Sequence, residues 1–279
     1  MTARTGTPSP PPLLPERALR VRILQVNSDR DAQRSLAAIE RRLGPSGATD
    51  LVALPEVFAV RGHHDRLRAA AESIPGPTTE HLARWARRLD AWILGGSLAE
   101  RRGRFIYNTS ILLDRAGKLA AVYRKRHLFA ARLTDGATVC EADLYQPGRR
   151  AVITTIEGWR CGLSICFDVR FPEDYRAYAA AGTHLLFIPS DFTKATGSAH
   201  WKTLVRARAI ETQCFVIAPN QCGSNRDTKI PSFGHSLAVD PWGTIMAEAG
   251  ARPATLDVTL DPQRLTEARS RIVLDGGRP

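Results

Sequence analysis

Three residues with reactive side chains each stand within two residues of the end of an apolar run of strand length. Glu56 ends the stretch 50–56, Lys125 follows residues 119–123, and Cys166 follows Cys161-Gly162-Leu163-Ser164-Ile165. Because the carboxyl ends of parallel strands meet at one edge of a sheet, Glu56 and Cys166 are expected to lie close together. A carboxylate, an ammonium group and a thiol would supply the base, the positive charge and the nucleophile that hydrolysis of an amide requires.

The surroundings of Cys166 favour a reactive thiol. Phe171-Pro172-Glu173 fits the start of a helix, with proline early and an acid in the first turn. A cysteine between a strand and a helix N-terminus lies in a positive partial field, which favours the thiolate. Free cysteines are also among the most buried and inert residues. The stretch around Cys166 therefore leaves both a nucleophile and a structural cysteine open.

Length and composition indicate one folded domain. The chain has 279 residues, is 43% hydrophobic, and shows neither a repeat nor an internal linker. We expect a disordered Pro-rich tail over residues 1–18 and a single domain over residues 19–279.

The chain has five cysteines without CxxC spacing, and neither a signal peptide nor a long apolar span is visible. We therefore expect a cytoplasmic protein without disulfides. Cysteines and histidines lack the spacing of metal ligands, so no metal and no cofactor is expected.

The formal net charge of +11 raises the question of a nucleic-acid partner. The basic residues are mostly arginines scattered along helical segments, and they match no DNA- or RNA-binding motif. Solvated helix faces explain them better. We therefore expect neither a nucleic-acid nor a membrane partner, and a small molecule as substrate.

Periodicity predicts alternating strands and helices, with hairpins added. Strands are expected over residues 20–26, 50–54, 91–97, 161–165, 185–188 and 214–218. Helices are expected over residues 31–43, 78–89, 175–181 and 200–211, the second capped by Thr78 or Thr79. Hairpins are expected over residues 105–123 and 236–248. Periodicity alone supports a layered α/β fold.

Three separate motifs bear a family resemblance. Leu54-Pro55-Glu56, Tyr123-Arg124-Lys125-Arg126-His127-Leu128-Phe129 and residues 162–173 match, in order and spacing, the signatures of the nitrilase superfamily of carbon–nitrogen hydrolases. The resemblance extends from about Val21 to Leu274. Residues 189–193, 196–201, 206–214 and 233–243 are similar to the branch that contains omega-amidase and deaminated-glutathione amidase.

The resemblance implies a four-layer α-β-β-α sandwich that pairs through helices near the nucleophile, hence a homodimer or a higher homo-oligomer. It also implies roles for the three reactive residues. Cys166 would attack an amide carbonyl, form a thioester and release ammonia, with Glu56 as general base. Lys125 and the backbone N–H of Phe167 would stabilise the oxyanion. The charge of Lys125 is also expected to lower the pKa of the Cys166 thiol.

Further residues receive supporting roles from the same resemblance. Glu141 would orient Lys125 or the attacking water; without the resemblance it reads as a solvated loop acid. Arg170 would grip a substrate carboxylate, because a guanidinium offers two parallel hydrogen bonds. A structural ion pair of Arg170 with Asp168 or Glu173 is the alternative. Three more residues are expected to line the pocket: Tyr145, Phe192 and Thr196.

These observations favour a cysteine amidase for a small omega-amide that carries a carboxylate, such as a 2-oxo acid amide or deaminated glutathione. The same residues would serve N-carbamoyl amino acid hydrolysis. A basic binding module without activity is a third hypothesis, against which the intact Glu56, Lys125 and Cys166 argue. The loop over residues 129–139 and the C-terminal residues 269–279 depart from the usual forms of the branch, which leaves the acyl group and the dimer contacts open.

Overall fold

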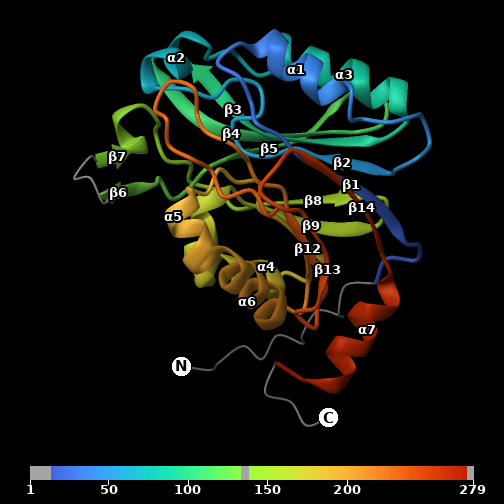
Figure 1. Ribbon diagram of the computed structural model, residues 1–279. Coiled ribbons are helices and arrows are strands. Elements are labelled where there is room, and N and C mark those ends of the chain that lie inside the picture. Colours follow the sequence, from blue (N-terminus) through green and yellow to red (C-terminus); the bar gives the residue numbers. More distant parts are fainter. Residues whose placement is uncertain (1–13, 133–137, 275–279) are drawn as a thin grey trace, which may run out of the picture.

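The computed structural model of the protein describes residues 14–132 and 138–274, and its core is a pair of stacked six-stranded sheets. The sheets lie between two helix layers (Figure 1). This is the four-layer α-β-β-α sandwich that the family resemblance implies.

The first sheet has the strand order β14-β1-β2-β3-β4-β5. Its strands are β1 (Leu19–Gln25), β2 (Leu51–Ala53), β3 (Trp92–Arg102), β4 (Phe105–Leu113), β5 (Leu119–Arg124) and β14 (Ala254–Leu260). The central strands β1, β2 and β3 run parallel, whereas β4, β5 and β14 are antiparallel to their neighbours. The last strand of the chain thus pairs with the first.

The second sheet has the order β13-β12-β11-β10-β9-β8. Its strands are β8 (Val152–Ile156), β9 (Trp159–Leu163), β10 (Leu185–Phe187), β11 (Phe215–Ala218), β12 (Leu237–Val239) and β13 (Ile245–Glu248). Here β9, β10 and β11 are the parallel strands. A short two-stranded sheet of β6 (Ala130–Arg132) and β7 (Thr138–Cys140) stands apart from both.

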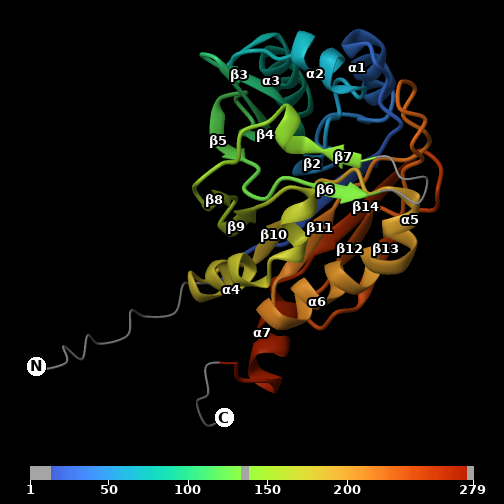
Figure 2. The ribbon, with the colours of Figure 1, turned by 90° about the vertical axis from the view of Figure 1, so that its left-hand side faces the viewer.

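Helices cover the outer face of each sheet. On the first sheet lie α1 (Ala32–Glu40) and α3 (Pro77–Leu89), and α2 (His64–Ala69) lies at its end. On the second lie α4 (Pro172–Ala180) and α6 (Lys202–Thr212), which continues a short helix α5 (Lys194–Thr196) and the π-helical turn Gly197–Trp201 (Figure 2). Helix α7 (Pro262–Arg271) follows β14. Every helix in the described ranges is too short or too polar to cross a bilayer.

The two faces of the first sheet belong to different apolar clusters, because successive strand residues point to opposite sides. On β2, Leu51 and Ala53 belong to the cluster shared with the second sheet, whereas Val52 packs in the cluster of α1 and α3. Strands buried on both faces must be apolar throughout, which is why this segment reads as a continuous run.

Most of the predicted elements are present within two or three residues of their expected bounds. The helix predicted over residues 78–89 begins one residue earlier, at Pro77, and its N-cap is Gly76 rather than Thr78 or Thr79. The N–H and hydroxyl of Thr78 instead donate to the carboxylate of Glu72.

The tail predicted over residues 1–18 lies outside the described residues up to residue 13. Its end is packed: Pro15 is buried, and the carbonyl of Arg17 accepts a hydrogen bond of 3.0 Å from the Trp159 indole. Residues 133–137 of the divergent loop also lie outside the described residues.

Candidate active site

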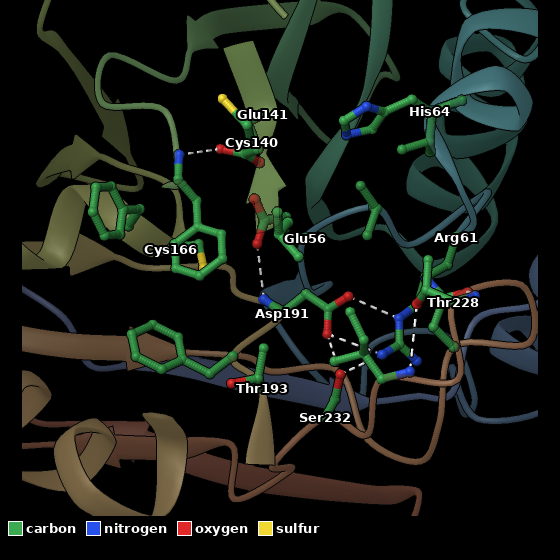
Figure 3. Close-up of a pocket in the computed structure, with 18 of the residues that line it drawn as sticks. Glu56, Arg61, His64, Cys140, Glu141, Cys166, Asp191, Thr193, Thr228 and Ser232 are labelled. Carbon is green, nitrogen blue, oxygen red and sulfur yellow. Dashed lines mark hydrogen bonds and ion pairs between the residues drawn. The ribbon is translucent and has the colours of Figure 1, made fainter. Parts of the chain in front are cut away.

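A cavity of about 570 Å³ opens at the carboxyl ends of the parallel strands of both sheets. It is shown in Figure 3. All nine residues that the sequence pointed to line it: Glu56, Lys125, Tyr145, Glu141, Cys166, Phe167, Arg170, Phe192 and Thr196. The site therefore draws on β2 and β5 of one sheet and on β9 and β10 of the other.

Glu56 follows β2 and is 3% exposed. Its Oε1 accepts hydrogen bonds of 2.8 Å from Lys125 Nζ and from Asn108 Nδ2, and its Oε2 accepts one of 2.8 Å from the backbone N–H of Asp191. Residues 54 and 55 pass so close to β3 that a Cβ on Gly96 would lie 1.9 Å from the Pro55 carbonyl oxygen. Glycine at this position lets the chain deliver Glu56 to the cavity.

Lys125 ends the β4–β5 hairpin and is 1% exposed. Its ammonium group lies between two carboxylates, 2.8 Å from Glu56 and 2.8 Å from Glu141. Although burial lowers the pKa of Lys125, the charges of Glu141 and Glu56 outweigh burial and raise it well above its usual value. The lysine is therefore a fixed positive charge.

Glu141 begins the 3-10 turn Glu141–Asp143 after β7. Besides Lys125, its carboxylate accepts a hydrogen bond of 2.7 Å from the backbone N–H of Phe129. Asn108 Nδ2 also lies 3.4 Å from Glu141 Oε1, so that this one amide faces both glutamates. The structure thus places Glu141 beside Lys125 and away from the solvated position that its loop alone would suggest.

Cys166 begins a 3-10 turn, Cys166–Arg170, that separates β9 from α4. Its φ of 47° is in the left-handed region, which is uncommon for a residue with a side chain. Its N–H donates to the carbonyl of Pro189 over 2.9 Å. The carboxylate of Asp168, fully buried, accepts from the Ile165 N–H, and this closes the turn. Cys166 is 7% exposed and lines the cavity.

The net shift of the Cys166 pKa is opposite to the one expected from the sequence. Burial, followed by the negative charge of Glu56, raises the pKa of Cys166 well above its ordinary value, and Lys125 only partly offsets this. Burial also raises the pKa of Glu56, against the opposing charge of Lys125. Both shifts favour the protonated forms, so burial favours a neutral Cys166 thiol and makes the Glu56 carboxylate a stronger base.

Arg170 has no carboxylate partner among the described residues, and so it forms neither of the ion pairs considered for it. Its guanidinium carbon lies 5.6 Å from the centroid of the Phe167 ring and 5.4 Å from that of Phe192. Its Nη2 lies 3.4 Å from His200 Nδ1, and its buried Nε is unbonded within residues 14–132 and 138–274. An arginine held between two aromatic rings, without an internal anion, is placed to take one from a ligand.

Asp168 has a different role. Asp168 accepts hydrogen bonds from the hydroxyl of Tyr123, 2.7 Å, and from the N–H and Nδ1 of His127, 2.9 Å each. The imidazole of His127 also stacks on Phe171 at 3.6 Å between centroids. His127 is thus bound to the turn that carries Cys166.

Four residues that contribute to the site were not predicted from the sequence. Asn108 bonds both glutamates, and Asp191 bonds Glu56 through its backbone. Arg61 and Ser232 bind the carboxylate of Asp191. The sequence signals were the polar run Tyr107-Asn108-Thr109-Ser110 inside an otherwise apolar strand and the place of Asp191 in the motif of residues 189–193. Arg61, five residues after Glu56, carries no such signal.

The chain is similar to proteins of one family along nearly its whole length. The family model described as carbon-nitrogen hydrolase matches residues 20–270. A deaminated glutathione amidase of Synechocystis is 38% identical over 229 residues, which cover 80% of this chain and 84% of that protein. The omega-amidase NIT2 of Pongo abelii is 34% identical, covering 91% of this chain and 90% of that protein.

The fold gives the same result. The crystal structure of Saccharomyces cerevisiae Nit3, a member of branch 10 of the nitrilase superfamily, matches with a TM-score of 0.83 at 29% identity, covering 93% of this chain and 96% of that one. A four-layer sandwich with a carboxylate, a lysine and a thiol in one cavity defines an enzyme of the nitrilase superfamily. The chain belongs to the carbon–nitrogen hydrolase family.

Proposed function

We propose that the protein hydrolyses the amide bond of a small omega-amide that carries a carboxylate, through a thioester on Cys166. The observation that carries this proposal is the buried contact of Glu56 with Lys125 in the same cavity as the Cys166 thiol and an Arg170 without an internal anion. This arrangement provides a base, an oxyanion partner, a nucleophile and a carboxylate anchor within one cavity.

In the first half-reaction, Glu56 takes the proton of the Cys166 thiol as sulfur attacks the amide carbonyl carbon. The carbonyl oxygen becomes an oxyanion, stabilised by Lys125 and the backbone N–H of Phe167. The tetrahedral intermediate collapses when protonated Glu56 gives its proton to the amide nitrogen. The carbon–nitrogen bond breaks, ammonia leaves, and a thioester remains on Cys166.

In the second half-reaction, Glu56 removes a proton from a water molecule, whose oxygen attacks the thioester carbonyl. Lys125 and the Phe167 N–H again face the oxyanion. The carbon–sulfur bond then breaks, and the sulfur of Cys166 recovers the proton from Glu56. Glu141 contributes by holding Lys125 in place through a second ion pair.

Two observations support the proposed acyl group. The half-buried Arg170 suits a carboxylate, and Phe192 and Thr196 lie along the same wall of the cavity. Relatives named deaminated glutathione amidase and omega-amidase act, by those names, on amides of this kind. Both observations favour an omega-amide of a 2-oxo acid, free or as part of a deaminated glutathione.

A coupled ammonia assay tests the proposal. The panel comprises 2-oxo omega-amides, deaminated glutathione, neutral amides of equal length, nitriles and N-carbamoyl amino acids, with Cys166→Ala as the inactive control. Ammonia release from the carboxylate-bearing amides, lost in Cys166→Ala, is expected. Release from Cys166→Ala at the wild-type rate would contradict the thioester route, and carbon dioxide from carbamoyl compounds alone would shift the assignment to carbamoyl hydrolysis.

We also propose that the protein acts in the cytoplasm as a homodimer or higher homo-oligomer, without a nucleic-acid or membrane partner. The absence of any disulfide among its five cysteines suits a reducing compartment. Ile210 on α6 and Trp242 beside it are 48% and 49% exposed, which supports pairing through this helix. Sedimentation velocity would measure the assembly, and a monomer at micromolar concentration would contradict it.

A further inference from the structure

A buried arginine, Arg61, lines the cavity and is 2% exposed, and Figure 3 shows it beside Asp191 and Ser232. It is bound to the carboxylate of Asp191 by two hydrogen bonds, Nε to Oδ2 over 2.7 Å and Nη2 to Oδ1 over 3.1 Å. Ser232 completes the group: its hydroxyl accepts from Arg61 Nη2 and donates to Asp191 Oδ1. Arg61, Asp191 and Ser232 are called the arginine clamp below.

The remaining donors of Arg61 are also used. Its Nη1 lies 3.2 Å from Asn27 Oδ1 and 3.3 Å from the carbonyl of Cys222. A guanidinium has five N–H groups, and the described contacts occupy as many acceptors. Arg61 therefore has no donor left for a substrate carboxylate, in contrast to Arg170.

The clamp holds residues 189–191, whose backbone bonds to both Glu56 and Cys166. The N–H of Asp191 donates to Glu56 Oε2 over 2.8 Å, and the carbonyl of Pro189, two residues earlier, accepts the Cys166 N–H over 2.9 Å. Arg61 itself stands five residues after Glu56. Its partners follow β1, β10 and β11, so one side chain ties together loops of both sheets around the base.

We propose that Arg61 is a positioning residue: through Asp191 it fixes the N–H that orients and stabilises the Glu56 carboxylate beside Cys166. The inference rests on the proposed amidase function, because it assigns Glu56 as the base. A displacement of about 1 Å at a reacting group can reduce turnover roughly 100-fold, so a side chain remote from the substrate can control the rate.

The test uses Arg61→Gln, Arg61→Lys and Asp191→Asn in the full chain. Arg115→Gln is the control, since Arg115 is likewise an arginine hydrogen-bonded to carboxylates, those of Asp50 and Glu157, but lies outside the cavity. We expect kcat to fall about 100-fold in Arg61→Gln and about 10-fold in Arg61→Lys, which keeps the charge, with KM changed less than about threefold. Arg115→Gln is expected to keep the wild-type kcat.

A second readout follows the base without any substrate. The rate at which iodoacetamide labels Cys166, measured by peptide mass spectrometry across pH, falls where Glu56 becomes protonated. Loss of the Asp191 N–H bond destabilises the carboxylate, so this acid limb is expected to move to higher pH in Arg61→Gln and Asp191→Asn. The other groups that face Glu56, namely Lys125, Glu141 and Asn108, are unchanged in these variants.

The outcomes separate the two proposals. A shifted labelling profile in an enzyme that hydrolyses no amide of the panel would support the clamp and reject the proposed function. Wild-type kcat and an unshifted profile in folded Arg61→Gln would overturn the clamp. If Arg61→Gln does not fold, Asp191→Asn and Arg61→Lys decide by the same two measurements, and an increase confined to KM would overturn the positioning role.

Discussion

The hydroxyl of Tyr123, on β5 of the first sheet, donates a hydrogen bond of 2.7 Å to Asp168. Asp168 lies in the turn that carries Cys166 and follows β9 of the second sheet. The bond joins the hairpin that ends at Lys125 to the segment that begins at Cys166. Two side chains thus hold the lysine and the nucleophile in register.

Replacing Asp168 is therefore expected to lower the stability of the protein. Asp168→Ala leaves four donors without their acceptor, two of them buried and the two of His127 partly buried, which would cost about 3 kcal/mol or more in the free energy of unfolding. Tyr123→Phe removes one of these bonds and would cost about 1 kcal/mol. Urea unfolding measures both, and equal costs would show that Asp168 is not the centre of the network.

The two glutamates at Lys125 are expected to differ in kind. Glu56→Gln removes the base and should abolish turnover, whereas Glu141→Gln removes one of two counter-charges of the lysine. We expect Glu141→Gln to lower kcat about 100-fold with KM nearly constant, because the oxyanion partner is displaced and the substrate contacts are kept. Steady-state kinetics distinguish the two, and identical residual rates would argue for two equivalent bases.

Arg170 is expected to act on binding. Arg170→Gln should raise KM at least about tenfold for amides that carry a carboxylate, since a charge-assisted hydrogen bond contributes about 1.5–3 kcal/mol. Neutral amides of equal length should be unaffected. Arg176→Gln, an exposed position on α4, is the control for a general change of charge. An equal rise of KM for neutral amides would contradict the anchoring role.

Acid stability should depend on Glu157, at the β8–β9 turn. Burial raises the pKa of Glu157, but hydrogen bonds from Arg115, Trp92 and Arg17 outweigh it and lower the pKa from 4.5 to about 2. A carboxyl whose pKa is lower in the folded state stabilises the protein above its unfolded pKa, and this contribution is lost as pH falls through the folded value.

Arg115→Gln should accordingly reduce the free energy of unfolding by about 1 kcal/mol at pH 7, after allowance for partial exposure of the pair. The difference from wild type should shrink between pH 4.5 and pH 2. Denaturant unfolding at several pH values measures it, and a difference that stays constant with pH would exclude the ionic origin.

The sequence predicted the parts of the site that stand at the ends of apolar strands. Glu56 and Cys166 each terminate a run that must be buried on both faces, so their position at the sheet edge follows from patterning alone. Their distance from Lys125 did not follow, because strand order within each sheet and the stacking of the two sheets are long-range properties. Only the family resemblance supplied these.

The sign of the net pKa shift at Cys166 could not be predicted either. The sequence shows a helix start after Cys166, but it does not show that Cys166 is 7% exposed or that the charge of Glu56 acts on its thiol more strongly than that of Lys125. Arg61 and Asp191 likewise meet only in the folded chain, 130 residues apart in sequence. Neither residue stands out from its neighbours in the sequence.

The pairing of β14 with β1 has a consequence for any divided form of the chain. A cut in the connection before β8 would leave Glu56, Lys125 and Glu141 on one fragment and Cys166 with Arg170 on the other. Strand β14, at the edge of the first sheet, would remain with the second fragment. Neither piece alone would hold a complete reaction centre. Ammonia release would return only on reassociation, so complementation of two inert fragments would report directly on the joining of the two sheets.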